Sequence, residues 1–262
     1  MQYISSRSNE KIKQLVKLGA SSKQRREQGL FVLEGARLCF DGAISSAEIE
    51  SAFFTEDALK KYESYAKTIE EKAKNVYKIS EEVSLALSDT KSPQGVFCLC
   101  KKKQHSDSEI DYNGCYIALD NLQDPSNLGA AARTAEALGI DGLIVSGGCD
   151  IYSPKAQRAA MGALIRINVI EISSLPEFIT DCRSKGMKTY ASTPMADSVK
   201  LDEADFSGGV ICVIGNEGAG VSEEVFAACE NKVTIPMAGR AESLNASAAA
   251  SIIMWELVKG RK

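Results

Sequence analysis

The chain has 262 residues, 44% of them hydrophobic and 25% charged, which is an ordinary composition for one or two globular domains. It has no run of about 18 apolar residues and no apolar signal-peptide core at its start, so we expect no membrane span and a cytoplasmic location. Eight cysteines without a C-x-x-C pair and a single histidine, His105, argue against a disulfide framework, a metal site and Ser-His-Asp catalysis.

The two parts of the chain differ in charge. Residues 1–105 contain 18 Lys and Arg against 14 Asp and Glu, whereas residues 106–262 contain 13 against 21. A basic N-terminal region next to an acidic remainder is expected if the N-terminal region holds a polyanion. The excess is small, so it is equally compatible with an unspecialised surface.

The first hundred residues predict a small α/β domain. Residues 1–29 have a helical pattern with an apolar stripe among Lys and Arg, which fits either a solvated helix or an arm that contacts phosphates. Beyond them we expect strands at 30–35, 49–54, 76–79 and 95–100, and helices at 36–43, 56–74 and after the N-cap Ser80. The polar residues 101–111 are predicted to link a domain of residues 1–104 to one of residues 112–262.

A different pattern begins at residue 115, where strands alternate with helices. We expect strands at 115–119, 142–145, 167–172, 188–192, 210–214 and 233–235. Helices are expected at 127–138, 155–164, 175–185, 222–230 and 243–258, with Ser222 and Ser243 as the N-caps of the last two. This alternation is typical of a mostly parallel sheet covered by helices on both faces.

The first of three candidate site motifs runs from Asn121 to Arg133. It follows a strand and opens a helix, at the edge of a parallel sheet where ligands bind in α/β proteins. Asn127 is a candidate cap for that helix. Arg133 lies among small alanines and needs an anionic partner, either a carboxylate in a surface salt bridge or a phosphate.

The second motif, Ile214 to Ser222, follows another apolar strand. Its glycines are spaced G-x-x-G-x-G, and not in the G-x-G-x-x-G order of a dinucleotide site. Glu217 within it is expected either to accept hydrogen bonds from a ligand or to hold Arg133.

The third motif is T-I-P-M-A-G-R-A-E-S-L-N-A-S at residues 234–247. Pro236 ends a short strand, and the small residues after it leave the main chain open to close approach by a ligand. This stretch is either an ordinary strand–loop–helix connection or the wall of a pocket.

In order and spacing, N-L-G-x-x-x-R, I-G-N-E-G-x-G and I-P-M-x-G-x-x-E-S-L-N-x-S resemble the three motifs of the SpoU (TrmH-like) branch of the SPOUT RNA methyltransferases. The similarity covers residues 115–258. The stretch G-L-F-V-L-E-G-A-R resembles the family's substrate-binding domain, of the type related to ribosomal protein L30e. The resemblance implies an α/β catalytic domain with a deep trefoil knot at about residues 210–245.

The family methylates ribose 2′-hydroxyls of RNA with S-adenosylmethionine, and the resemblance implies this activity here. It further implies a homodimer, and the type of N-terminal domain favours 23S ribosomal RNA as the substrate. The alternatives are a transfer RNA substrate or an RNA-binding protein of this fold without catalysis. A dinucleotide-dependent enzyme is disfavoured by the order of the glycines.

Position by position, the resemblance assigns Arg133 as the catalytic arginine, surrounded by the polar residues Asn127, Glu217, Ser243 and Asn245. The cofactor-binding residues that it implies are Thr193, Gly215, Asn216, Gly220, Ile235, Met237 and Leu244. Arg133 is expected either to act as the base or to orient a phosphate, and the second role suits a guanidinium, which stays protonated in proteins. The apolar helix at 243–258 is expected to pack in the core or in a dimer interface.

Overall fold

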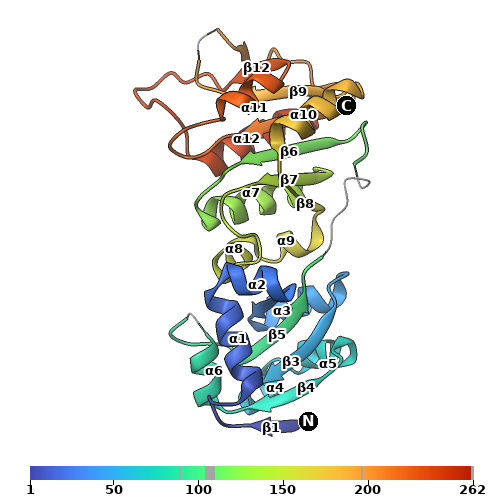
Figure 1. Cartoon of the computed structure of the whole chain (residues 1–262), viewed down its shortest axis with the longest axis vertical. Helices are drawn as coiled ribbons and strands as arrows, with labels where there is room; N and C mark the ends of the chain where they lie inside the picture. The colour runs from blue at the N-terminus through green and yellow to red at the C-terminus, as the bar shows by residue number, and fades with distance from the viewer. Residues whose placement is uncertain (89, 104–109, 196, 261–262) are drawn as a thin grey trace. The chain divides into compact units, whose positions relative to one another are not determined.

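The computed structural model describes residues 1–88, 90–103, 110–195 and 197–260. It divides into two compact units. Unit 1 comprises Met1–Gln104 and Asp150–Arg166, and unit 2 comprises His105–Cys149 and Ile167–Lys262 (Figure 1). Within the described ranges, no helix is long and apolar enough to cross a membrane.

Unit 1 contains a five-stranded sheet in the order β1-β4-β3-β5-β2. Its strands are β1 (Gln2–Ile4), β2 (Leu30–Glu34), β3 (Ile49–Phe54), β4 (Val76–Ile79) and β5 (Val96–Lys101). Its helices are α1 (Glu10–Ala20), α2 (Ser22–Gln28), α3 (Ala36–Ile44), α4 (Glu56–Lys61), α5 (Glu63–Lys72) and α6 (Glu81–Leu87). The strand β5 runs antiparallel to both of its neighbours, whereas β4 pairs in parallel with β1 and β3.

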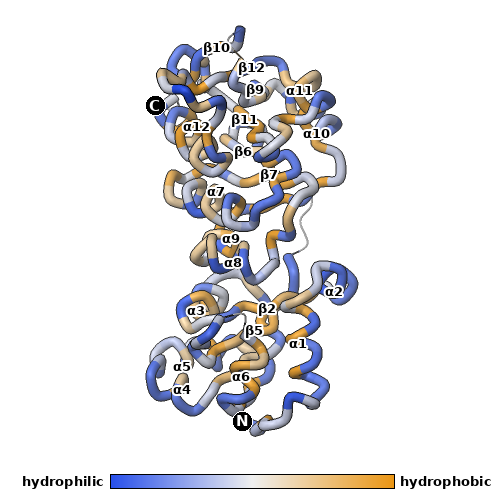
Figure 2. Tube along the Cα trace, turned by 90° about the vertical axis from the view of Figure 1, so that its left-hand side faces the viewer, coloured by the Kyte–Doolittle hydropathy of each residue, from blue (hydrophilic) through white to orange (hydrophobic). Residues whose placement is uncertain are grey.

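The amphipathic pattern at the start of the chain is explained by α1. Its residues Ile12, Leu15 and Leu18 are buried in the core of unit 1, and Figure 2 shows hydrophobic and hydrophilic residues alternating along this helix. The expected single helix at 1–29 is nevertheless wrong, because the chain is extended at Ser21. The Ser21 hydroxyl there accepts a hydrogen bond from Gln24 N (3.3 Å) and starts α2.

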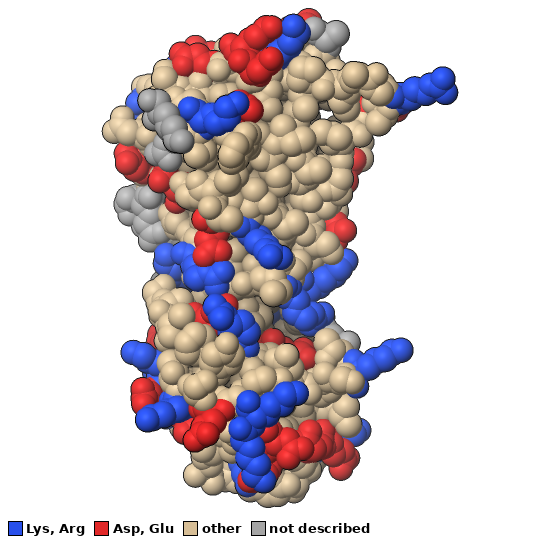
Figure 3. Space-filling model, turned by 180° about the vertical axis from the view of Figure 1, so that it is seen from behind, with Lys and Arg blue, Asp and Glu red and all other residues tan. Residues whose placement is uncertain are grey.

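Two further helix predictions in this unit had different outcomes. The helix expected at 56–74 is interrupted at Tyr62, whose backbone (φ −118°, ψ 37°) leaves the helical region. The predicted cap Ser80 is confirmed, since its hydroxyl accepts from Val83 N at 3.2 Å. On the face shown in Figure 3, the Lys and Arg side chains of unit 1 are interspersed with Asp and Glu.

The segment Asp150–Arg166 belongs to unit 1 although it lies far along the chain. It forms α8 (Pro154–Ala160) and α9 (Ala163–Arg166), so the single helix expected at 155–164 is wrong. The interruption falls at Met161 and Gly162, whose φ angles are 50° and 86°. These left-handed conformations end a helix because each turns the chain out of the hydrogen-bond ladder.

Buried ion pairs hold this segment. The Arg25 side chain, 5% exposed, donates from Nε to Asp150 Oδ2 at 2.7 Å. The Asp41 carboxylate, 4% exposed, accepts from Arg37 Nε at 2.9 Å and from Arg166 Nη1 at 3.0 Å. Charges this deeply buried are tolerated only when they are paired, so the segment is a built part of unit 1.

Unit 2 contains a seven-stranded sheet in the order β10-β12-β9-β11-β6-β7-β8. All of its described strand pairings are parallel. Its strands are β6 (Cys115–Asp120), β7 (Gly142–Ser146), β8 (Val169–Ile172), β9 (Lys188–Ser192), β10 (Val199–Lys200), β11 (Val210–Ile214) and β12 (Asn231–Thr234). Its helices are α7 (Pro125–Leu138), α10 (Leu175–Ser184), α11 (Glu223–Ala228) and α12 (Ala246–Gly260).

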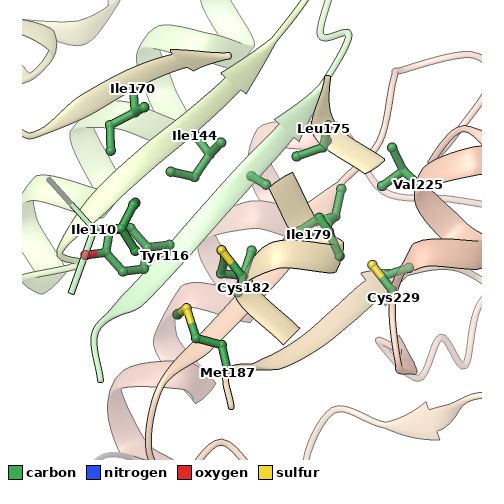
Figure 4. Close-up of a cluster of buried hydrophobic side chains, with 14 residues drawn as sticks. Ile110, Tyr116, Ile144, Ile170, Leu175, Ile179, Cys182, Met187, Val225 and Cys229 are labelled. Carbon is green, nitrogen blue, oxygen red and sulfur yellow. The ribbon is translucent and has the colours of Figure 1, made fainter. Parts of the chain in front are cut away.

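Helices cover both faces of this sheet, as predicted. On one face, Leu175 and Ile179 of α10 and Val225 of α11 pack on alternate residues of the central strands (Figure 4). On the other face, α12 packs against α7 and contacts β6 and β11. The stretch at residues 210–245, expected to be knotted, forms β11, α11, β12 and the loop that leads to α12.

Candidate active site

A cavity of about 560 Å³ opens where three adjacent parallel strands end. Ser192 ends β9, Ile214 ends β11 and Ile235 follows β12, and all three residues line the cavity. Ligands of parallel α/β sheets bind beyond the carboxyl ends of the strands, so this is the expected place for a site. The other lining residues are Thr193, Pro194, Met195, Gly215, Asn216, Glu217, Gly218, Ala219, Gly220, Val221, Glu223, Phe226, Ala227, Met237, Ser243, Leu244, Ala246, Ala249 and Ile253.

The glycine-rich motif forms one wall of the cavity as a tight turn. Asn216 and Gly220 exchange two backbone hydrogen bonds of 2.9 and 3.0 Å. The Asn216 side chain accepts from the main chain of Gly218 and Ala219 and donates to Asn121 O at 2.9 Å. A Cβ on Gly215 would lie 2.1 Å from the backbone of Gly220, so the turn needs glycine at this position.

Glu217 fastens this turn to the first motif. Its Oε2 accepts from Gln123 N at 3.0 Å. Its Oε1 accepts from Asp124 N at 3.0 Å and from Asn127 Nδ2 at 2.9 Å. Burial raises the pKa of Glu217, but the hydrogen bonds from Asn127, Gln123 and Asp124 together outweigh it and hold the pKa below its ordinary value. Of the two partners expected for Glu217, Arg133 forms no ion pair or hydrogen bond with it among the described residues.

The third motif joins the same network through Asn245. Its Nδ2 donates to Asn127 Oδ1 at 3.0 Å, so Asn127 links Glu217 to Asn245. Asn127 is 7% exposed, and both the nitrogen and the oxygen of its side-chain amide form a hydrogen bond. These side-chain hydrogen bonds connect three stretches of the chain, because Asn127 lies 90 residues from Glu217 and 118 residues from Asn245.

Two predicted helix caps are wrong. The N-cap of α7 is Asp124, which accepts from Ser126 N at 2.9 Å, so Asn127 lies inside the first turn and is free to face Glu217. The start of α12 is capped by Asn245, whose Oδ1 accepts from the main chain of Ser247 (3.0 Å) and Ala248 (3.3 Å). Ser243 lies two residues before this cap and lines the cavity instead.

Arg133 lies on α7 and its side chain is exposed. Within the described ranges it has neither an ion pair nor a hydrogen bond, so the surface salt bridge considered for it does not form. It does not line the cavity. The guanidinium is thus left available to an anion from outside the described residues.

The seven residues predicted for the cofactor all line the cavity: Thr193, Gly215, Asn216, Gly220, Ile235, Met237 and Leu244. Sequence reasoning missed other lining residues, such as Pro194, Met195, Glu223, Phe226 and Ile253. Pro194 and Met195 follow the end of β9, and their position after a parallel strand was a usable signal. The remaining three face the cavity only because of how α11 and α12 pack.

Unit 2, with its open parallel sheet and a cavity between the loops at the strand ends, is therefore a ligand-binding α/β domain. The chain adds a second α/β unit to it. The SpoU rRNA Methylase family matches residues 114–255, and the MRM3-like substrate binding domain matches residues 9–98. The chain belongs to the SpoU rRNA methylase family.

Individual relatives match over nearly the whole chain. An uncharacterized tRNA/rRNA methyltransferase of Synechocystis sp. is 31% identical over 97% of this chain and 92% of its own length. The 23S rRNA (guanosine(2553)-2′-O)-methyltransferase RlmP of Bacillus subtilis is 29% identical over 98% and 99%. The crystal structure of an AdoMet-bound rRNA methyltransferase from Sinorhizobium meliloti superposes with a TM-score of 0.88 at 28% identity, covering 98% of this chain and 97% of that one.

These comparisons confirm the predicted family and the SPOUT α/β fold. They also confirm the class of enzyme, an RNA methyltransferase that uses S-adenosylmethionine.

Proposed function

We propose that the protein methylates a ribose 2′-hydroxyl of 23S ribosomal RNA with S-adenosylmethionine. The observation that carries the proposal is the hydrogen-bonded chain from Glu217 through Asn127 to Asn245, which assembles the three motifs beside one cavity. The ribosomal target is supported by the Bacillus subtilis relative, whose name specifies 23S rRNA and a 2′-oxygen and whose similarity spans both units.

The cavity suits this cofactor. The apolar residues Met195, Met237 and Leu244 line the cavity and are partly exposed, so they offer a surface for the adenine ring. Within the described chain, the main-chain groups of residues 236–244 make no hydrogen bond, so their N–H and C=O groups are available to a ligand. We therefore assign cofactor binding to the seven predicted residues, all of which line the cavity.

The cofactor supplies an electrophilic methyl group on a sulfonium sulfur. Methyl transfer to the ribose oxygen would be a displacement at this carbon, in which the hydroxyl would also have to lose its proton. For this displacement the hydroxyl must be held in line with the methyl group. We propose that Arg133 holds the phosphate of the target nucleotide and that Ser243, which lines the cavity, directs its hydroxyl to the ribose.

The catalytic assignments divide into two groups. Arg133 and Ser243 are proposed to face the RNA. Asn127, Glu217 and Asn245 are proposed to position those groups, because their side chains are engaged with one another and with the starts of α7 and α12.

Arg133 tests the proposal most directly. We expect Arg133→Ala to leave cofactor affinity and thermal stability unchanged and to lower methyl transfer by at least about 100-fold, a loss typical of a residue that positions the reactants. Arg133→Lys should recover part of the rate if the role is to hold a phosphate, since lysine keeps the charge. Transfer of tritiated methyl groups to ribosomal RNA measures the rate.

Either of two results would contradict the proposal: no binding of S-adenosylmethionine by calorimetry, or an unchanged rate in Arg133→Ala. Mapping 2′-O-methyl groups in the ribosomal and transfer RNA of a deletion strain decides between the ribosomal target and the transfer RNA alternative. Loss at a transfer RNA position would replace the ribosomal assignment.

We further propose that residues 1–104 bind the RNA, that the protein is a homodimer and that it works in the cytoplasm where ribosomes are made. The match of residues 9–98 to a substrate binding domain supports the first point. For the second, α12 exposes Ile252 (40%) and Trp255 (56%) while burying Ile253 and Leu257. Apolar residues on both sides of one helix are expected where the outer side meets a second copy, and sedimentation analysis tests this.

A further inference from the structure

Two of the described residues that line the cavity are charged, and both are acidic. They are Glu217 and Glu223, and no Lys, Arg or His is among the described lining residues. Acidic groups at a cavity wall favour cationic ligands over anionic ones. The two carboxylates differ, however, in what they contact.

Glu217 is turned toward α7. Its two oxygens accept three hydrogen bonds of 2.9 to 3.0 Å from the main chain of Gln123 and Asp124 and from the Asn127 side chain. A carboxylate with these acceptor positions filled has little capacity left for a ligand.

Glu223 has no such partners. It lies in the first turn of α11, it is one of the residues that line the cavity, and it is exposed. Across the described ranges its side chain takes part in no ion pair or hydrogen bond. Its carboxylate is therefore the charged group of the cavity wall that remains free for the ligand.

We infer that Glu223 recognises the positive charge of the cofactor and makes the cavity prefer S-adenosylmethionine to its demethylated product, S-adenosylhomocysteine. This inference rests on the proposed function. The cofactor carries a sulfonium, an ammonium and a carboxylate, a net charge of about +1 at neutral pH. Methyl transfer leaves both electrons of the carbon–sulfur bond on sulfur. The sulfur of S-adenosylhomocysteine is therefore an uncharged thioether, and the net charge of this product is zero.

The attraction between Glu223 and the ligand is consequently stronger before transfer than after it. The same carboxylate favours loading of the cofactor and release of the product, which competes for the same cavity. Because Glu223 is exposed and its field is screened by water and salt, we expect a preference of roughly three- to tenfold from this residue.

The adjacent Glu224 offers a matched control. It has the same side chain in the same turn of α11 and is also exposed, but it does not line the cavity. Glu223→Gln and Glu224→Gln therefore change net charge and helix-end electrostatics equally. They differ in whether a carboxylate is removed from the cavity wall.

The test measures three dissociation constants by titration calorimetry on the full chain. The ligands are S-adenosylmethionine, S-adenosylhomocysteine and sinefungin, in which a carbon with a protonated amine replaces the methylated sulfur. We expect Glu223→Gln to weaken the two cationic ligands roughly three- to tenfold and to change S-adenosylhomocysteine less than about twofold. Glu224→Gln should leave all three values unchanged.

A second measurement needs no variant. In the unmodified protein, the dissociation constant of S-adenosylhomocysteine divided by that of S-adenosylmethionine should fall toward one as salt rises from about 0.05 to 0.5 M, because screening weakens charge recognition. A Glu223→Gln protein that keeps the full preference, or loses affinity equally for all three ligands, would overturn the inference and leave the proposed function standing. A wild-type protein that binds no S-adenosylmethionine would instead overturn the proposed function.

Discussion

Replacing Glu217 by glutamine tests whether the glycine-rich turn is fastened to α7 as the structure shows. Glutamine matches glutamate in shape but has one acceptor oxygen and one NH₂ donor. If its oxygen takes the place of Oε1, it keeps the hydrogen bonds from Asp124 N and Asn127 Nδ2, while its NH₂ group faces the N–H of Gln123. One hydrogen bond is lost and two donors confront each other.

The size of the effect follows from these contacts. A lost intramolecular hydrogen bond costs about 1 kcal/mol, and an opposed pair of donors adds a similar amount. Glu217 is exposed, so water relieves part of this cost. We therefore expect Glu217→Gln to lower the free energy of unfolding by about 1–2 kcal/mol at pH 7.

The difference in unfolding free energy between wild type and Glu217→Gln should also depend on pH. The pKa of Glu217 in the folded protein lies below its ordinary value, so the carboxylate stabilises the fold above the unfolded pKa of about 4.3. This contribution is lost as the pH falls through the folded pKa, whereas glutamine does not titrate. The gap between wild type and Glu217→Gln should thus narrow steadily below about pH 4.

Urea denaturation followed by circular dichroism at pH 7 and pH 3.5 measures both quantities. Glu224→Gln is the control, because an exposed carboxylate without a partner should change stability by less than about 0.5 kcal/mol. Equal unfolding free energies for wild type and Glu217→Gln at both pH values would refute the reasoning.

Two more substitutions test the backbone and the buried charges. Gly215→Ala places a Cβ 2.1 Å from the backbone of Gly220, so the turn must open; we expect cofactor affinity to fall at least about tenfold by calorimetry, and unaltered affinity would contradict the described turn. Asp41→Asn removes a 4%-exposed charge from Arg37 and Arg166, which are 66% and 32% exposed and can be solvated. We expect a loss of about 1–3 kcal/mol in urea denaturation, and a loss within 0.3 kcal/mol of zero would show that the pairs contribute nothing.

The sequence was informative about which stretches meet and less so about how they meet. Parallel strands with site residues at their carboxyl ends follow from the alternation of strands and helices, and this placed residues such as Gly215 and Ile235 correctly at one edge. The partners of Glu217 were missed because two of its three donors are main-chain N–H groups, which no side-chain pattern identifies.

The helix caps show the same difficulty at a smaller scale. Ser243, Asn245 and Ser247 are all acceptable caps by residue type. The choice of Asn245 depends on where the chain turns after the loop, and that is set by its hydrogen bond to Asn127, 118 residues away. That Asp150–Arg166 belongs to unit 1 could not be predicted from local sequence either, because the ion pair between Arg25 and Asp150 joins residues 125 positions apart.

The network around Asn127 engages Glu217 without Arg133. Glu217 and Arg133 belong to adjacent motifs, and a direct ion pair between them would neutralise both. Instead, main-chain and amide donors fill the acceptor positions of Glu217. Among the described residues, the side chains of Arg133 and Glu223 have no ion-pair or hydrogen-bond partner. If Arg133 holds an RNA phosphate and Glu223 faces the cationic cofactor, as proposed above, the two substrates are attracted by opposite charges.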